Sequence, residues 1–188
     1  MEYANGGDLT EYLITNGSLE EIQVKIWFRQ ISLAVRYLHI DFRLAHRDIK
    51  LDNILLHNNE CKLTDFGFCK MSWDITKNCP LMADTFCGTE PYLSPQLASK
   101  TIYNPYKADI WAMGVLLYCL LNNRFPYTIG NIRSMVIQQY DKNHMAKRWT
   151  RKLSIDSFDL VLKLLQSDED LRISIDNVLA HRWLQIEP

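Results

Sequence analysis

The chain has 188 residues and is 47% hydrophobic and 23% charged, which is the composition of an ordinary globular domain. Its formal net charge is −1, so no overall field favours a nucleic acid or a membrane surface as a partner. The longest apolar run, residues 110–121, is too short to cross a bilayer and predicts a buried helix. We therefore expect one globular domain with neither nucleic acid nor membrane as its partner.

The cysteine content indicates a reducing compartment. The chain has five cysteines, an odd number, and none of them forms a C-x-x-C pair. This pattern predicts neither a disulfide framework nor a zinc site, and it favours a cytoplasmic location. The residues are Cys61, Cys69, Cys79, Cys87 and Cys119.

The first residues predict a turn that leads into a helix. Gly6 and Gly7 allow the backbone to turn, and Asp8 stands where a residue would cap the start of a helix. The alternative is a frayed N-terminal end.

A long amphipathic helix is expected to follow and to end at residues 39–41. Residues 18–21 read S-L-E-E and predict a capping box, because Glu21 lies three residues after Ser18. The predicted core face of this helix consists of Ile22, Ile26, Leu33, Val35 and Leu38.

Two short apolar runs, residues 54–56 and 61–64, flank a polar turn and predict a β-hairpin. Asn53 and Asp65 stand immediately outside the two runs. The hairpin would therefore place both side chains at neighbouring strand ends, facing one pocket.

The second half of the chain is expected to be helical after a long irregular loop. Residues 68–90 are polar and carry no periodic pattern, which predicts a functional or disordered loop. Helices are expected from Asp109, as a possible N-cap, to residue 121, and at residues 131–139, 157–166 and 175–179.

A run of basic residues surrounds Trp149 in the later part of the chain. Such a run can bind nucleic acid, but in a nearly neutral protein it is also typical of a solvated surface, which we favour. Its members are Lys142, Lys147, Arg148, Arg151 and Lys152.

The stretch from residue 46 to residue 53 reads H-R-D-I-K-L-D-N, and the tripeptide at residues 65–67 reads D-F-G. A lone Asp in a polar loop is usually a turn residue, but these spacings match the H-R-D-x-x-x-x-N and D-F-G motifs of phosphoryl transfer. The chain resembles a protein kinase, and a serine/threonine kinase in particular because Lys50 lies two residues after Asp48.

Other stretches extend the resemblance over nearly the whole chain. Residues 88–96 resemble the G-T-x-x-Y-x-x-P-E close of a kinase activation segment, with Gln96 where Glu is usual. Residues 109–114 resemble D-x-W-x-x-G, in which Asp109 would bond the catalytic-loop backbone, and Arg172 resembles a late kinase arginine. Three stretches look most like the calcium/calmodulin-dependent kinase group: D-F-G-F at residues 65–68, T-F-C-G-T at residues 85–89 and N-P-Y-K-A-D-I-W at residues 104–111. Within that group, the chain looks most like the testis-specific serine kinase family.

The resemblance implies a fold and indicates which part of the kinase domain the chain contains. Residues 1–188 would be a partial protein kinase domain, consisting of the hinge and the C-terminal lobe, with an activation segment at about residues 65–96. That lobe is mainly α with a small β-hairpin, and the N-terminal lobe would be missing. Met1 would lie at the gatekeeper position, and it could be an internal methionine of a longer kinase.

The resemblance also implies catalytic roles. Asp48 would accept the proton of the substrate hydroxyl, and Lys50 would bind the γ-phosphate as it transfers. Thr89 would bond both side chains and help select Ser or Thr as acceptor. Asn53 and Asp65 would hold Mg²⁺.

ATP would be bound by the residues around the hinge. The backbone of Glu2 and Ala4 would bond the adenine edge, Asp8 would reach the ribose, and Leu55 would lie under the adenine ring. The G-x-G-x-x-G loop and the β3 lysine of kinases do not occur in this sequence, so we expect weak ATP binding and poor transfer from this polypeptide alone.

Regulation and specificity follow from the same resemblance. Arg47 would pair with a phosphate on Thr85 and order the activation segment; alternatively, Thr85 is an unmodified loop residue. Asp8 and Asp52 suggest basic residues before the acceptor, whereas Cys119 stands where basophilic kinases often carry Glu.

The predicted function is therefore that of a serine/threonine protein kinase fragment. It would transfer the ATP γ-phosphate to Ser or Thr hydroxyls of protein substrates. The alternatives are a catalytically impaired kinase lobe that binds or regulates other proteins, with Gln96 unable to form the usual ion pair, and a nucleic-acid-binding protein. The oligomeric state is left open.

Overall fold

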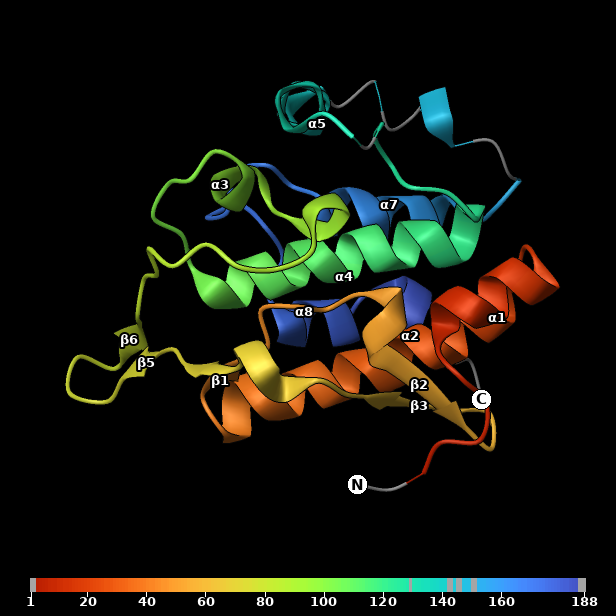
Figure 1. Ribbon diagram of the computed structural model, residues 1–188, viewed down its shortest axis with the longest axis horizontal. Coiled ribbons are helices and arrows are strands. Elements are labelled where there is room, and N and C mark those ends of the chain that lie inside the picture. The colour runs from red at the N-terminus through yellow and green to blue at the C-terminus, as the bar shows by residue number, and fades with distance from the viewer. Residues whose placement is uncertain (1–2, 129, 142–143, 145–146, 150–151, 186–188) are drawn as a thin grey trace.

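The computed structural model describes residues 3–128, 130–141, 144, 147–149 and 152–185. Helices dominate this part of the chain (Figure 1). They are α1 (Leu9–Asn16), α2 (Glu21–Arg36), α3 (Pro95–Ala98), α4 (Pro105–Asn122), α5 (Ile132–Tyr140), α7 (Ile155–Leu164) and α8 (Ile175–Leu179). The expectation of a mainly helical chain is confirmed. None of the helices in the described ranges is long and apolar enough to cross a membrane.

Short antiparallel strand pairs complete the described fold. They are β1 (Leu44–Ala45) with β4 (Lys70–Met71), β2 (Ile54–His57) with β3 (Glu60–Leu63), and β5 (Trp73–Asp74) with β6 (Cys79–Pro80). The β2–β3 pair is the predicted hairpin, and it is confirmed. Its two-residue turn consists of Asn58 and Asn59 with φ of 50° and 65°, which matches the twist of the two strands.

Helix α4 is the centre of the core and crosses the middle of the molecule in Figure 1. It is buried on all sides, as its uninterrupted apolar sequence predicts, and packs against α2 and α7. It begins at Pro105, one turn earlier than expected, because the Asn104 side chain accepts the N–H groups of Tyr106 and Lys107. The suggestion that Asp109 is an N-cap is therefore wrong.

The predicted capping box of α2 is also wrong. Glu20 occupies the N-cap position, and its side chain makes no capping bond. The Glu21 carboxylate instead accepts bonds from the Ser154 backbone N–H at 2.9 Å and from the Trp183 indole N–H at 2.7 Å. It thereby joins the start of α2 to the start of α7 and to the turn at Arg182–Leu184.

The core face of α2 differs from the one expected. Ile22, Ile26 and Leu33 are 61%, 39% and 43% exposed, and Leu38 is half-buried. The sequence carries two apolar stripes, and the helix buries the one with the two large aromatic rings, which removes more apolar area from water. The buried stripe consists of Val24, Trp27, Phe28, Ile31 and Val35.

Helix α1 begins as predicted, with Asp8 as its N-cap. The segment before it lies along β2, and the Gly6 N–H donates to the Leu56 carbonyl at 2.9 Å. A Cβ at Gly6 would stand 2.8 Å from the Leu56 Cβ, so this close approach requires glycine.

The loop expected at residues 68–90 is not wholly irregular. It contains β4, β5 and β6, and the β5–β6 hairpin projects from the body of the protein (Figure 1). Each of these strands is two residues long, which is too short for an alternating pattern to appear in the sequence. Pairing with β1 ties the start of this loop to the residues just before His46.

The later helices agree with the prediction to within about a turn. The basic run lies partly outside the described residues, which include neither Lys142 nor Arg151. Trp149 packs against Tyr118 and Phe158, with ring centroids 5.6 and 4.7 Å apart. The Trp149 ring is therefore half-buried against the core and is engaged in packing, which supports the interpretation of this run as a solvated surface.

Candidate active site

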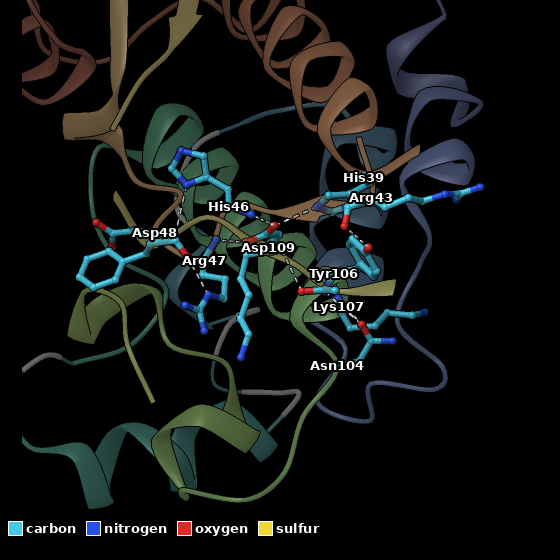
Figure 2. A network of polar contacts seen from close by, with 12 residues as sticks. His39, Arg43, His46, Arg47, Asp48, Asn104, Tyr106, Lys107 and Asp109 are labelled. Atoms are coloured by element: carbon cyan, nitrogen blue, oxygen red, sulfur yellow. Dashed lines mark hydrogen bonds and ion pairs between the residues drawn. The ribbon is translucent and has the colours of Figure 1, made fainter. Parts of the chain in front are cut away.

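The Asp109 carboxylate anchors the stretch at residues 46–53 to the central helix (Figure 2). Its two oxygens accept the backbone N–H groups of His46 and Arg47, each at 2.8 Å. The His39 ring nitrogen Nε2 lies 2.8 Å from the same carboxylate. Asp109 is 1% exposed, so these charge-assisted bonds form in a site of low dielectric constant. The expected contact between Asp109 and this backbone is present.

The anchor compensates for a strained backbone. Arg47 has a φ of 68°, in the left-handed region that residues other than glycine seldom adopt. On the other side, the His46 ring bonds the Thr64 carbonyl at 3.0 Å and accepts the Asp48 N–H at 3.3 Å. The backbone before Asp48 is thus held from two directions.

Four residues predicted to be catalytic meet at one point, which we call the Asp48 cluster: Asp48, Lys50, Asn53 and Thr89. The Lys50 ammonium lies 2.8 Å from one Asp48 carboxylate oxygen, and the Thr89 hydroxyl donates to the other at 2.8 Å. The Asn53 amide nitrogen donates to the Asp48 backbone carbonyl at 2.8 Å and to its carboxylate at 3.2 Å. Lys50 also donates to the Thr89 hydroxyl at 2.9 Å.

The cluster keeps Asp48 ionised. Burial of the carboxyl raises its pKa and is the largest single effect, but the hydrogen bonds from Lys50, Thr89 and Asn53 and the Lys50 charge together outweigh it. The net result is a pKa below the ordinary value of 3.8. Asp48 is therefore a carboxylate at neutral pH.

Thr89 reaches the cluster because the backbone next to it can approach closely. Gly88 has a φ of +113°, and a Cβ there would lie 3.2 Å from the Arg47 carbonyl oxygen. Three residues after Thr89, the Tyr92 hydroxyl accepts the Leu51 N–H at 3.3 Å. The close approach at Gly88 and the Tyr92 bond together keep residues 88–92 against the 46–53 stretch.

The predicted regulatory pair is in direct contact. Arg47 donates from Nη1 to the Thr85 hydroxyl at 2.9 Å and from Nε to the Phe68 carbonyl at 2.8 Å. Thr85 is exposed. The guanidinium therefore bridges two distant points of the 68–90 loop.

Asp65 lies close to the cluster but does not join it. The Thr64 N–H donates to the Asn53 carbonyl at 3.0 Å, so the two backbones adjoin, as the hairpin prediction requires. The Asp65 carboxylate is exposed and accepts the Gly67 N–H at 3.2 Å. Asn53 instead turns its side chain toward Asp48.

A hollow of about 610 Å³ lies beside Asp65, and it includes Ala4 and Leu55 among its described lining residues. Glu2 lies outside the described residues, so its predicted contact stays a prediction. Asp8 does not line this hollow, because its carboxylate caps α1 by accepting the Glu11 N–H at 2.8 Å. A ribose contact by Asp8 stays a prediction.

Gln96, which stands where Glu is usual in the 88–96 motif, is held by a hydrogen bond. Arg172 is 2% exposed and donates to the Gln96 amide oxygen at 3.1 Å and to the Lys107 carbonyl at 2.7 Å. Burial lowers the pKa of Arg172 to about 10, so the guanidinium remains charged at neutral pH. A neutral Gln can thus occupy this place.

Sequence reasoning missed two supporting residues, His39 and Tyr92. His39 stands 70 positions from Asp109, and no motif in the sequence links them. Tyr92 belongs to the G-T-x-x-Y motif at residues 88–96, which indicates that this tyrosine has a structural or functional role. The motif does not reveal the bond between Tyr92 and Leu51.

Comparison with known proteins assigns the family. Residues 1–184 match the protein kinase domain family. The human testis-specific serine/threonine-protein kinase 1 is 37% identical to the chain over 186 residues. The human testis-specific serine/threonine-protein kinase 3 is 38% identical to it over 184 residues. The serine/threonine-protein kinase kin-29 of Caenorhabditis elegans is 36% identical over 186 residues.

Each of these alignments covers 98% of the chain, which therefore belongs to the protein kinase domain family. Its relatives are serine/threonine kinases, and the first two are testis-specific ones, as the sequence motifs predicted. The chain spans 50%, 66% and 22% of the lengths of these three relatives, in the same order.

We predict that Lys50→Met raises the pKa of Asp48, because the variant loses both a hydrogen bond and a positive charge. In the wild type, the depressed pKa means that ionised Asp48 stabilises the fold near neutral pH, and this contribution is lost as pH falls from about 3.8 through the folded-state pKa. Carboxyl ¹³C chemical shifts followed against pH measure the pKa of Asp48 in the wild type and in Lys50→Met. Lys62→Met, at an exposed ion pair, is the control and should leave Asp48 unchanged. An unchanged Asp48 pKa in Lys50→Met would contradict the prediction.

Proposed function

We propose that this chain is the phosphate-transferring part of a serine/threonine protein kinase, acting on Ser or Thr hydroxyls of protein substrates with ATP as donor. The observation that carries the proposal is the Asp48 cluster, in which an ionised carboxylate, an ammonium group and a hydroxyl lie within 2.9 Å of one another. Phosphoryl transfer requires mainly positioning and charge neutralisation, and these groups can supply both.

Each residue of the cluster has a chemical task in this proposal. The Asp48 carboxylate accepts the proton of the incoming hydroxyl and orients its oxygen. Lys50 offers a positive charge to the phosphate being transferred. Thr89 donates to Asp48 and thereby fixes the direction in which the carboxylate faces. Its place beside the acceptor position fits a preference for Ser or Thr.

The residues expected to hold Mg²⁺ offer suitable ligands. The nitrogen of the Asn53 amide is engaged with Asp48, so the amide oxygen is the end that a cation would use. Asp65 offers an exposed carboxylate, and the backbone of its neighbour Thr64 is bonded to the Asn53 carbonyl. Mg²⁺ binds one or two such oxygens together with phosphate oxygens, and when bound it neutralises charge on the phosphates.

The remaining parts of the proposal concern ATP and the segments around it. The hollow lined by Ala4 and Leu55 would receive the adenine ring, with the backbone of Glu2 and Ala4 on its edge and Asp8 toward the ribose. Residues 1–188 would form the hinge and the C-terminal lobe of the domain, with the activation segment at about residues 65–96. The helical content and the β2–β3 hairpin support this assignment.

The test is phosphate transfer from radiolabelled ATP to a generic basic peptide that contains one Ser. We expect slow incorporation that requires Mg²⁺ and falls about 10²- to 10⁴-fold in Asp48→Asn, because the general base is lost. Asp176→Asn, which breaks only the exposed pair with Arg36, is the control and should retain the wild-type rate.

Equal rates for Asp48→Asn and the wild type would reject the catalytic role of Asp48. If the chain incorporates no phosphate and millimolar Mg-ATP leaves its melting temperature unchanged, the alternative gains support. That alternative is a kinase-family module that binds or regulates other proteins without catalysis.

We further propose that phosphorylation of Thr85 orders the activation segment, since Arg47 already donates to its hydroxyl. A phosphate there would convert a neutral contact into a charge-assisted one, worth about 1.5–3 kcal/mol or roughly tenfold or more in the ordered population. Thr85→Ala should therefore lower the activity of the phosphorylated kinase by about tenfold.

The measurement compares initial rates at matched phosphorylation of all other sites. Thr76→Ala, at the exposed turn of the β5–β6 hairpin, is the matched control and should behave as the wild type. Equal rates for Thr85→Ala and the wild type would show that Thr85 is an ordinary loop residue.

A further inference from the structure

One side of helix α2 is left uncovered by the rest of the described chain. The helix packs against β3, α8 and α4, and it runs below the last two in Figure 1. On its solvent side Ile22, Ile26 and Leu33 are exposed, and so is Tyr37, which directly follows the helix. The three aliphatic side chains were expected in the core, so their exposure needs an explanation of its own.

The exposed apolar side chains form a continuous row. From Ile22 through Ile26 and Leu33 to Tyr37 they recur at intervals of four, seven and four residues, which keeps them on one face of the helix. The Tyr37 ring meets the exposed Phe42 ring edge-on, with centroids 4.9 Å apart, so the row ends in an aromatic pair. Single exposed apolar residues are ordinary on a protein surface, whereas a contiguous row is typical of an interaction site.

A row of basic side chains runs beside the apolar one. Lys25, Arg29 and Arg36 each stand three residues after an apolar member, and residues three apart are neighbours on a helix surface. Arg36 lies 2.8 Å from the exposed Asp176 carboxylate. Within the described ranges, the side chains of Lys25 and Arg29 form no ion pair. We call the two rows together the α2 face: Ile22, Lys25, Ile26, Arg29, Leu33, Arg36 and Tyr37.

The charge of the α2 face favours one occupant over the others. A second copy of this chain would present the same face, in which no member is Asp or Glu, so it could not neutralise Lys25 and Arg29. An anionic membrane attracts clusters of about four to eight basic residues, and here two unpaired cations belong to a chain of net charge −1. A straight apolar row with a charged flank is instead the surface that a second helix complements.

We propose that the α2 face binds an amphipathic helix of another protein, with an aliphatic stripe and a row of Asp or Glu along one flank of that stripe. The aliphatic stripe would cover Ile22, Ile26 and Leu33, and the carboxylates would lie beside Lys25 and Arg29. None of these residues belongs to the Asp48 cluster, so this interaction does not depend on phosphate transfer.

The experiment uses two synthetic helical peptides, each stapled and labelled with a fluorophore. The first carries Leu along one stripe and Glu on both flanks, so that its copies repel one another, and the second has Lys in place of every Glu. We expect the Glu peptide to bind with a Kd about tenfold lower than that of the Lys peptide, by fluorescence anisotropy at low salt. Salt should reduce this difference, and methyl NMR shifts should appear at Ile22, Ile26 and Leu33.

Exposed substitutions connect the binding to the α2 face without disturbing the core. Arg29→Glu should abolish the preference for the Glu peptide, because the face then carries one unpaired charge of each sign. Ile26→Ser should weaken binding of the Glu peptide. Helix α5 supplies matched controls, since Arg133 is exposed there and Ile132 is 42% exposed, against 39% for Ile26. Arg133→Glu and Ile132→Ser should leave both dissociation constants unchanged.

The inference is overturned if the two peptides bind equally or not at all, if Arg29→Glu keeps the preference, or if the methyl shifts lie outside the α2 face. Self-association of the chain alone, measured by sedimentation and lost in Ile26→Ser, would also overturn it and identify a second copy as the occupant. Binding to vesicles that contain phosphatidylserine, lost in Arg29→Glu and without any binding of the Glu peptide, would point to a membrane surface instead.

Discussion

The carboxylate of Asp109 is the contact on which the rest of the site depends. It lies in α4, which is buried along nearly its whole length, so its position is set by the packing of the core. The Asp109 carboxylate accepts the N–H groups of His46 and Arg47. These two bonds fix the position of the stretch that contains Asp48, Lys50 and Asn53. The polar stretch at residues 46–53 is thereby held by a buried helix, as the proposed phosphoryl transfer would require of a preorganised site.

The second constraint on the site is the path of residues 65–96. Described contacts tie this segment to the 46–53 stretch at separate points: Arg47 holds Phe68 and Thr85, Thr89 bonds Asp48, and Tyr92 receives the Leu51 N–H. Thr89 completes the Asp48 cluster only while these contacts persist.

The sequence predicted which residues meet in the site better than it predicted the packing around them. The spacing of Asp48, Lys50 and Asn53 identified the cluster, and the motif at residues 88–96 added Thr89, because these residues belong to motifs that phosphoryl transfer constrains closely. The contact between His39 and Asp109 could not be predicted, since it joins positions far apart in the chain and no motif contains both.

The errors in the fold have a common physical cause, which is competition between local patterns. Helix α2 carries two apolar stripes, and only tertiary packing decides that Trp27 and Phe28 face inward while Ile22 and Ile26 remain exposed. Ser18 and Glu21 satisfied the local rule for a capping box, but the Glu21 carboxylate accepts hydrogen bonds from Ser154 and Trp183 instead. Local sequence rules give way when residues distant in the chain offer competing contacts.

Hydrogen exchange at the backbone amides of His46 and Arg47 in Asp109→Asn shows directly whether Asp109 holds the site together. The amide side chain of Asn offers one acceptor oxygen in place of two, so at least one of these N–H groups loses its partner. We predict that its exchange accelerates roughly tenfold or more, as expected for a buried donor left unsatisfied, while amides in α7 exchange as in the wild type. Unchanged exchange at both His46 and Arg47 in the folded variant would contradict the claim that Asp109 holds the site together.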